Sequence, residues 1–197
     1  SHAHRDHFDF ATLRAIQKRS PEAVLYLPSG AGAMARDEGL KNIRILEWWE
    51  SERIGEAKIH YLPSHHWSRM GVNDQMQVHW LSFAFEVDGR TVYFAGDTGY
   101  SSHFRRIADR FPRGFDAALM PLGAFAPRWF MEAAHVDPPQ SLLATQELAA
   151  RMMLPIHWGT FDLADEKPRE PVLYLERLLE DSEQPAVLWR PGGLLDL

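Results

Sequence analysis

The chain has 197 residues, of which 45% are hydrophobic and 24% charged, a composition typical of a globular protein with one sizeable core. The formal net charge is -6 and no run of lysine or arginine occurs, which argues against nucleic acid as a partner. Cysteine is absent, so disulfides and thiolate metal sites are excluded, and histidine and carboxylate remain as the strong metal ligands.

The first half of the chain reads mainly as strands after one helix. Helical spacing of apolar residues predicts a helix over residues 10–18, and a turn separates a short apolar strand from a short helix over residues 31–39. The predicted strands cover residues 23–27, 43–48, 51–54, 57–62, 78–87 and 91–95. The dipeptide Asp88-Gly89 between the last two favours a hairpin.

The second half alternates between helices and strands. We predict helices near residues 102–111, 138–151 and 171–179, and strands over residues 117–123, 153–158 and 186–190. This order indicates an α/β or mixed (α+β) layered fold. Because no repeat, low-complexity tract or linker is visible, we assign residues 1–197 to one domain. No apolar stretch approaches the ~18 residues that a membrane span needs.

The opening stretch SHAHRDH groups several metal-binding side chains. Alternate residues of an extended segment point to the same side, so His2 and His4 can hold one cation. Asp6 and His7, at the turn into the first helix, can face a second cation. A lone histidine is more often a solvated or core residue, but this cluster favours a metal site.

Two further motifs follow predicted strands, where loops present side chains from a rigid base. In LPSHHWSR, the adjacent His65 and His66 point in different directions, so one can be a ligand and the other its neighbour. In FAGDTGY, glycines flank Asp97, whose two carboxylate oxygens can bridge two cations. The alternative for Asp97 is a turn aspartate at a strand end.

Two more motifs combine a histidine with the end of an element. In AAHVDPPQS, Asp137 before two prolines is typical of a helix N-cap, whereas His135 has no visible structural role. In PIHWGTF, His157 ends a buried strand, which favours a functional histidine over one hydrogen-bonded in the core. The histidines within predicted strands or on a helix are interpreted as structural or surface residues: His60, His79 and His103.

In chain order, HxHxDH, a later histidine, the aspartate of GDTG and a final histidine after a strand resemble the metallo-β-lactamase superfamily of dinuclear metal hydrolases. Within it, LPSHHWSR, FAGDTGY, PLGAFAPRWFMEAAHVDPPQS and PIHWGTF resemble the branch that contains N-acylphosphatidylethanolamine-hydrolysing phospholipase D and its bacterial relatives. The stretch over residues 121–141 is the most specific, because it is unrelated to the ligands that the whole superfamily shares. The resemblance implies an αββα sandwich.

The resemblance also implies roles for the matching residues. It assigns a first zinc ion to His2, His4 and His66, a second to Asp6, His7 and His157, and both to Asp97 as a bridge. His66 is preferred to His65 because the ligand of that branch lies directly before the tryptophan. His135 matches a histidine that lines the active site without being a core ligand. We predict that it donates a proton to the leaving oxygen, with a pKa near neutrality.

The implied chemistry is hydrolysis. Imidazole and carboxylate suit zinc, with manganese or iron as alternatives. Two such ions roughly 3.5 to 4 Å apart lower the pKa of a bridging water towards ~7 and stabilise the oxygens of an in-line displacement. We therefore expect a phosphodiesterase acting on an N-acylated phospholipid or a smaller glycerophosphodiester. A lactonase or amidase on the same metals is the alternative, and a non-catalytic scaffold is less favoured.

Apolar residues near the motifs indicate a groove for acyl chains, with core packing or a homodimer contact as alternatives: Trp67, Phe125, Trp129, Phe130 and Met131. Such a protein would be cytoplasmic or peripheral to a membrane. In the superfamily, several strands precede the HxHxDH loop. We therefore expect that residues 1–197 are the C-terminal part of a longer chain and that the N-terminal strands of the sandwich lie outside them.

Overall fold

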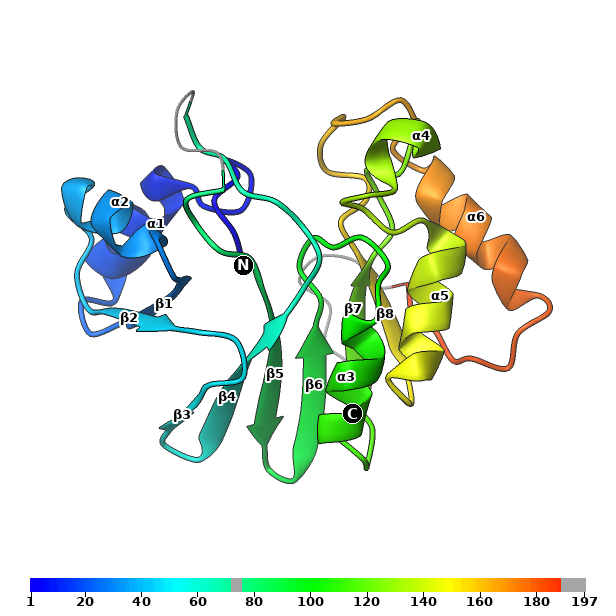
Figure 1. The fold of residues 1–197 in the computed structure, drawn as a ribbon, viewed down its shortest axis with the longest axis horizontal. Coiled ribbons are helices and arrows are strands. Elements are labelled where there is room, and N and C mark those ends of the chain that lie inside the picture. Colours follow the sequence, from blue (N-terminus) through cyan, green and yellow to red (C-terminus); the bar gives the residue numbers. More distant parts are fainter. Residues whose placement is uncertain (72–75, 189–197) are drawn as a thin grey trace.

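The computed structural model describes residues 1–71 and 76–188, and Figure 1 shows how their helices flank the sheets. The larger sheet has the strand order β3-β4-β5-β6-β7-β8, and β1 and β2 form a second sheet. The strands are Leu25–Pro28 (β1), Ile43–Leu46 (β2), Ser51–Ile54 (β3), Ala57–Pro63 (β4), Leu81–Val87 (β5), Arg90–Phe94 (β6), Ala117–Pro121 (β7) and Met153–Ile156 (β8). The helices are Phe10–Arg19 (α1), Ala31–Asp37 (α2), His103–Arg110 (α3), Arg128–Met131 (α4), Pro138–Glu147 (α5) and Glu170–Leu179 (α6).

The direction of the strands brings several loops to one end of the larger sheet. Strands β3 to β6 pair antiparallel, and β6, β7 and β8 pair parallel. The expected hairpin is confirmed: Asp88 and Gly89 have φ of 50° and 75°, as a type I′ turn requires. Strand β4 therefore runs in the same direction as β6, β7 and β8. The loops that follow the carboxyl ends of these four strands therefore emerge at the same end of the sheet.

Alternation along the strands produces the layers, because successive side chains point to opposite faces of a sheet. Leu62 packs on one face, in a cluster with Phe104 of α3 and side chains of α5 and α6. Its neighbour Tyr61 packs on the other face, in a cluster with Leu46 of β2. A third cluster, which includes Ala35 of α2, covers the outer side of the small sheet. The layers are helices, sheet, sheet and helices, which confirms the αββα sandwich.

Several element boundaries differ from those predicted. The helix predicted over residues 138–151 ends at Glu147, because the chain turns at Ala149 with a φ of 50°. The strand predicted from residue 78 begins at Leu81, and α4 was not predicted. In the strand predicted over residues 186–190, Ala186 forms an isolated bridge with Met153. Residues 189–190 lie outside the described residues. The single-domain assignment and the longer chain stay predictions.

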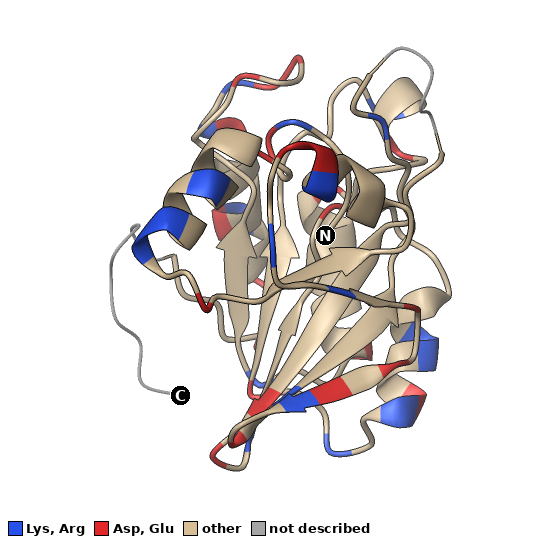
Figure 2. Cartoon of the chain, turned by 90° about the vertical axis from the view of Figure 1, so that its left-hand side faces the viewer, with Lys and Arg blue, Asp and Glu red and all other residues tan. Residues whose placement is uncertain are grey.

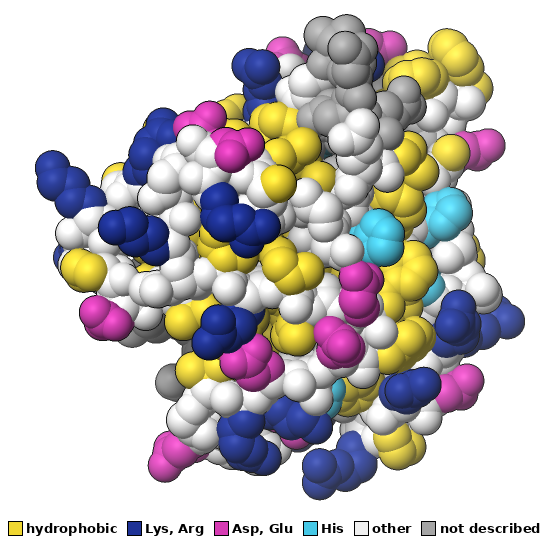
Figure 3. Space-filling view, turned by 60° about the vertical axis from the view of Figure 1, so that its left-hand side comes forward, with side chains coloured by type: hydrophobic (Ala, Val, Ile, Leu, Met, Phe, Trp, Pro, Cys, Tyr) yellow, Lys and Arg dark blue, Asp and Glu magenta, His cyan; other side chains and the backbone are white. Residues whose placement is uncertain are grey.

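Charges of both signs occur on the free edge of the larger sheet. Strand β3, at this edge, has the sequence SERI and is mostly exposed. Figure 2 shows acidic and basic residues on and around this edge of the sheet. Charged edge strands are poor templates for pairing with another chain. On the face drawn in Figure 3, basic and acidic side chains are likewise interspersed. Among the described residues, none of the helices is long and apolar enough to cross a membrane.

Candidate metal centre

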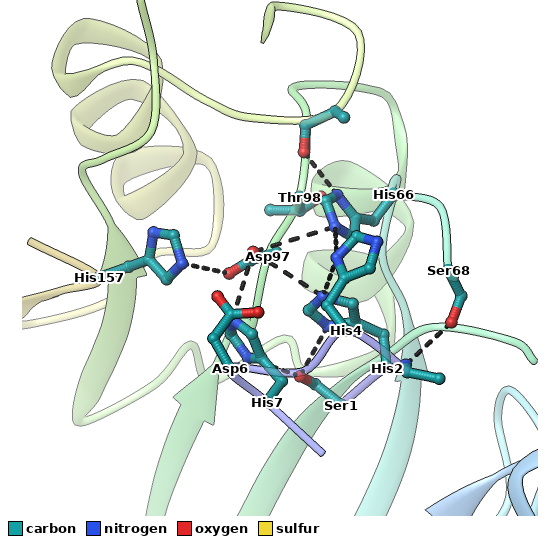
Figure 4. Close-up of polar contacts among 12 residues, drawn as sticks. Ser1, His2, His4, Asp6, His7, His66, Ser68, Asp97, Thr98 and His157 are labelled. Carbon is teal, nitrogen blue, oxygen red and sulfur yellow. Dashed lines mark hydrogen bonds and ion pairs between the residues drawn. The ribbon is translucent and has the colours of Figure 1, made fainter. Parts of the chain in front are cut away.

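The histidine and aspartate motifs converge at the end of the sheet where the loops after β4, β6 and β8 emerge (Figure 4). His66 follows β4, Asp97 follows β6 and His157 follows β8. The opening segment lies beside them, held by a hydrogen bond from the Leu81 backbone N–H to the Ser1 carbonyl oxygen at 2.9 Å. Four segments that are far apart in sequence therefore contribute to one site.

Asp97 lies at the middle of this site and is only 4% exposed. Its Oδ2 lies 3.4 Å from His7 Nε2 and 3.9 Å from the Nε2 atoms of both His2 and His66. Its Oδ1 lies 3.2 Å from His157 Nε2 on the opposite side. Oδ2 thus faces the imidazoles of His2, His7 and His66 and Oδ1 faces that of His157, so the carboxylate lies within reach of cations on either side of it.

The donor atoms fall into overlapping groups within which all atoms lie within 4.8 Å of one another. These groups are His2, His4 and His66; His2, His7 and Asp97; Asp6, His7 and His157; and His66, Asp97 and His135. The first and third are the two ligand sets that the resemblance implied, and the second joins them through Asp97. We call the first and third groups the first triad and the second triad.

Backbone carbonyl groups orient two of the imidazoles. His66 Nδ1 donates to the Ala134 carbonyl oxygen at 2.8 Å, and His157 Nδ1 donates to the Gly123 carbonyl oxygen at 3.0 Å. In each ring the hydrogen bond at Nδ1 leaves Nε2 free to face Asp97, an arrangement common at metal sites. Gly123 N–H also donates to the His157 carbonyl oxygen at 3.0 Å. This reciprocal pair holds His157 in a left-handed conformation, with a φ of 57°.

Two glycines are required by close contacts around the site. A Cβ on Gly123 would lie 2.6 Å from the His157 carbonyl oxygen, a separation that side chains do not tolerate. Gly96, directly before Asp97, has a φ of 62°, and its Cβ would lie 3.0 Å from Ser1 Cβ. Only glycine adopts such a conformation at no steric cost. The glycines therefore let neighbouring segments approach the carboxylate and the imidazole.

Several donor atoms of the site are buried without a hydrogen-bond partner among the described residues. They are His4 Nε2, Asp97 Oδ1 and His135 Nδ1. Buried polar atoms are normally paired, so unpaired ones in a cluster need an explanation. Nitrogen and carboxylate donors with free lone pairs are what zinc and similar divalent cations bind. The donor set therefore fits a metal centre.

Burial controls the charge of these side chains. It lowers the pKa of His66 to about 3 and lowers the pKa values of His2 and His4. Burial by itself would raise the pKa of Asp97, but a hydrogen bond from His7 and the nearby His157 hold that pKa well below its ordinary value. The rings of His2, His4 and His66 are therefore neutral and the Asp97 carboxylate is ionised near pH 7, the forms that bind metal.

His135 lies at the rim of both triads. Its ring centroid is 5.0 Å from that of His66 and 6.1 Å from that of His157. Burial is the largest effect on its pKa, which falls to about 4. This differs from the near-neutral pKa expected from sequence, because that expectation took no account of burial. Near pH 7 the ring is neutral and carries one N–H.

The adjacent histidines of the HHW motif have different environments. His66 is buried in the cluster, whereas the side chain of His65 is exposed. The His65 backbone N–H donates to Thr98 Oγ1 at 2.9 Å, and its carbonyl oxygen accepts from Gly99 N–H at 2.7 Å. The structure therefore brings His66, and not His65, to Asp97.

The residues interpreted as structural lie outside the triads. His60 pairs with Glu86, His79 pairs with Glu47, and buried His103 hydrogen-bonds to Ser101. Asp137 caps α5: its Oδ1 accepts from the Gln140 backbone N–H at 2.9 Å in a capping box. These interpretations are confirmed.

Two residues that position the ligands indirectly are not predicted from the sequence. Ser68 Oγ accepts from the Ala3 N–H at 2.9 Å and so anchors the opening segment. The buried Glu166 carboxylate accepts from the N–H groups of Phe125 and Ala126, at 3.0 and 2.8 Å. Ser68 lies inside a motif that was noticed, but Glu166 lies in the charged stretch ADEKPRE, where nothing local distinguishes it.

The apolar residues proposed for an acyl groove divide between core and surface. Phe125 is buried, with its ring 6.4 Å from that of Tyr174. Trp129 and Phe130 on α4 are largely exposed. Trp67 is close to the centre, because its ring centroid is 4.4 Å from that of His4.

Comparisons with known proteins agree with this geometry. Residues 1–158 match the family described as "Beta-lactamase superfamily domain". The chain is 36% identical over 187 residues to the mitochondrial N-acyl-phosphatidylethanolamine-hydrolyzing phospholipase D of Saccharomyces cerevisiae, covering 91% of this chain and 40% of that protein. It is 31% identical over 194 residues to N-acyl-phosphatidylethanolamine-hydrolyzing phospholipase D 1 of Caenorhabditis elegans, covering 93% and 54%. The chain therefore spans about half the length of these relatives.

The fold is also that of solved structures. A metallo hydrolase from the hyperthermophilic archaeon Ignicoccus hospitalis superimposes with a TM-score of 0.70 at 23% identity. The superposition covers 98% of this chain and 75% of that one. At this level of identity the likeness establishes the fold alone.

Proposed function

The chain belongs to the β-lactamase superfamily, and from that membership we propose that it is a metal-dependent hydrolase that cleaves phosphodiesters at a centre of two zinc ions. The observation that carries the proposal is the placement of Asp97 between the two triads. The similarity to two relatives named for hydrolysing N-acyl-phosphatidylethanolamine supports the substrate class, which is an N-acylated phospholipid or a smaller glycerophosphodiester.

The first triad would hold one ion and the second triad the other, with Asp97 shared between them. The unpaired buried atoms of His4 and Asp97 support this assignment, because they are free to act as ligands. When bound, two zinc ions supply positive charge at the phosphoryl oxygens and lower the pKa of the attacking water. The carboxylates of Asp6 and Asp97 would offset part of the repulsion between the two cations.

The chain itself contributes orientation and a proton-bearing group. The carbonyl groups of Ala134 and Gly123 fix the rings of His66 and His157. His135 lies next to both rings with its Nδ1 unpaired, so it is placed to meet a group of the substrate. Because its ring is neutral near pH 7, we propose that its single N–H hydrogen-bonds to the leaving oxygen as the bond breaks.

The test compares two bond types on zinc-reconstituted protein. We expect two equivalents of zinc by elemental analysis, and faster hydrolysis of bis(p-nitrophenyl) phosphate than of any member of a lactone panel. Mass spectrometry after incubation with an N-acylated phospholipid should detect a phosphatidic acid product. Faster lactone opening would move the assignment to a lactonase, and binding of less than one equivalent of transition metal would favour a scaffold. The variant Asp97→Ala serves as the inactive control.

A further inference from the structure

A pocket of about 180 Å³ opens beside the second triad, and Asp6, His7 and His157 line one side of it. The remaining wall comes mainly from the loop between β8 and α6 and from the start of α6. Its apolar members are Trp158, Phe161, Leu163, Ala164, Pro168 and Pro171. The volume is below the ~300 to 1,000 Å³ of pockets that enclose drug-sized ligands. The pocket therefore suits one short chain and not a whole diacyl lipid.

The charged residues of the pocket leave its interior apolar. Both oxygens of Glu166 are used by the backbone N–H groups of Phe125 and Ala126, and Asp6 belongs to the second triad. Lys167 is exposed, so its ammonium group reaches solvent. Away from the second triad, an ionic group inside the pocket would lose hydration without gaining a partner, whereas an apolar group loses nothing.

Two apolar wall residues are exposed in the free protein. Phe161 is 63% exposed and Leu163 is 55% exposed, although both line the pocket. An apolar occupant would remove part of their surface from water, and the free-energy gain is proportional to the area covered. The wall chemistry therefore selects an alkyl or acyl chain.

The pocket is held in shape before any ligand arrives. The loop is tied at its start by the reciprocal hydrogen bonds between His157 and Gly123. It is tied near its end by Glu166, and by the Asp165 N–H, which donates to the Ala126 carbonyl oxygen at 3.1 Å. A preformed pocket spares the cost of ordering a loop on binding.

We propose that this pocket binds the apolar chain attached next to the scissile bond and sets the preferred length of that chain. The proposal rests on the proposed function in one respect, namely that the reaction occurs at the triads. A methylene group takes up roughly the ~30 Å³ that one water molecule occupies in the liquid. The pocket of about 180 Å³ therefore holds a chain of about six carbons. Each buried methylene should raise kcat/KM about fourfold until that length is reached.

The experiment uses alkyl p-nitrophenyl phosphates with chains from methyl to decyl. In the unmodified protein, kcat/KM should rise about fourfold per carbon and level off near six carbons. Ala164→Phe fills the pocket and should flatten this rise, and Phe161→Ser, at an exposed wall position, should weaken it. The matched control Ala33→Phe, on the exposed side of α2, should keep the full rise. A rise that is unchanged in Ala164→Phe, or absent from the unmodified protein, overturns the proposal.

A binding measurement separates this proposal from the proposed function. Calorimetric titration with alkylphosphonates of the same chain lengths should show affinity increasing with length, and Ala164→Phe should abolish the increase. If this occurs while no phosphodiester is hydrolysed, the pocket assignment stands and the phosphodiesterase assignment fails. If phosphodiesters are hydrolysed but neither rate nor affinity depends on chain length, the pocket assignment fails and the phosphodiesterase assignment stands.

Discussion

Replacing Gly123 by alanine tests whether the backbone of the loop after β7 positions His157. The added Cβ would lie 2.6 Å from the His157 carbonyl oxygen, which must retreat by about 0.8 Å to reach the 3.4 Å of ordinary contact. That carbonyl oxygen accepts from Gly123 N–H, and the Gly123 carbonyl oxygen accepts from His157 Nδ1, both at 3.0 Å. The substitution should therefore strain both bonds and displace the ring from its present position beside Asp97.

The size of the displacement sets the expected effect. A misplacement of about 1 Å in an active site costs on the order of 10²-fold in rate. Loss of the group that orients a metal-binding histidine costs ~10 to 100-fold in metal affinity. We expect Gly123→Ala to lower kcat/KM for bis(p-nitrophenyl) phosphate by about 10²-fold and to weaken zinc binding at the second triad. The first triad does not include His157 and should still bind zinc. Overpacking should reduce the free energy of unfolding by ~1 to 3 kcal/mol.

The assay combines zinc titration, steady-state kinetics and urea unfolding on the same preparation. Gly32→Ala in α2 is the matched control, because the nearest atoms to its Cβ would be the ends of the Arg36 and Ile45 side chains, at 3.3 Å. This control should retain both zinc equivalents and normal turnover. A folded Gly123→Ala protein with two tightly bound zinc ions and unchanged kcat/KM would refute the positioning argument.

Four further outcomes are expected. Asp97→Ala should abolish activity and remove more metal than a change at either histidine of the HHW pair, because a shared ligand serves both ions; retention of two zinc ions would show that Asp97 is not shared. In zinc titrations, His66→Ala should lose affinity strongly and His65→Ala by no more than ~10 to 100-fold, and the reverse ranking would make His65 the ligand. His135→Ala should keep both metals but slow turnover by ~10² to 10⁴-fold, with a smaller loss for nitrophenolate than for poor leaving groups; equal losses would indicate substrate binding instead. Burial lowers the pKa of His103 to about 3, so as the pH falls below the ordinary value of 6.5 the unfolded state takes up a proton at this residue before the folded state does. In metal-free protein, the contribution of His103 to the free energy of unfolding should therefore be complete above pH 6.5 and fall by ~2 kcal/mol between pH 6.5 and 5. Urea unfolding should show this fall in the unmodified protein and not in His103→Gln.

The parts of the site that could be predicted from sequence depend on neighbouring residues. The turn at Asp88-Gly89 and the cap at Asp137 need only local backbone geometry, so short motifs were enough to predict them. The histidines of the opening motif could be recognised because ligands at alternate positions are close in any extended segment. The αββα fold was expected because the order of these motifs resembled a known superfamily.

The sequence by itself determined which side chains were available for a metal centre and which loops carry them. Only the tertiary structure decided how they meet. His66 rather than His65 faces Asp97 because of contacts made by the loop after β4, and His157 is oriented by Gly123, 34 residues away in sequence. The pKa of His135 falls because other segments bury it. Such contacts depend on the packing of distant segments, and no local pattern of residue types records that packing.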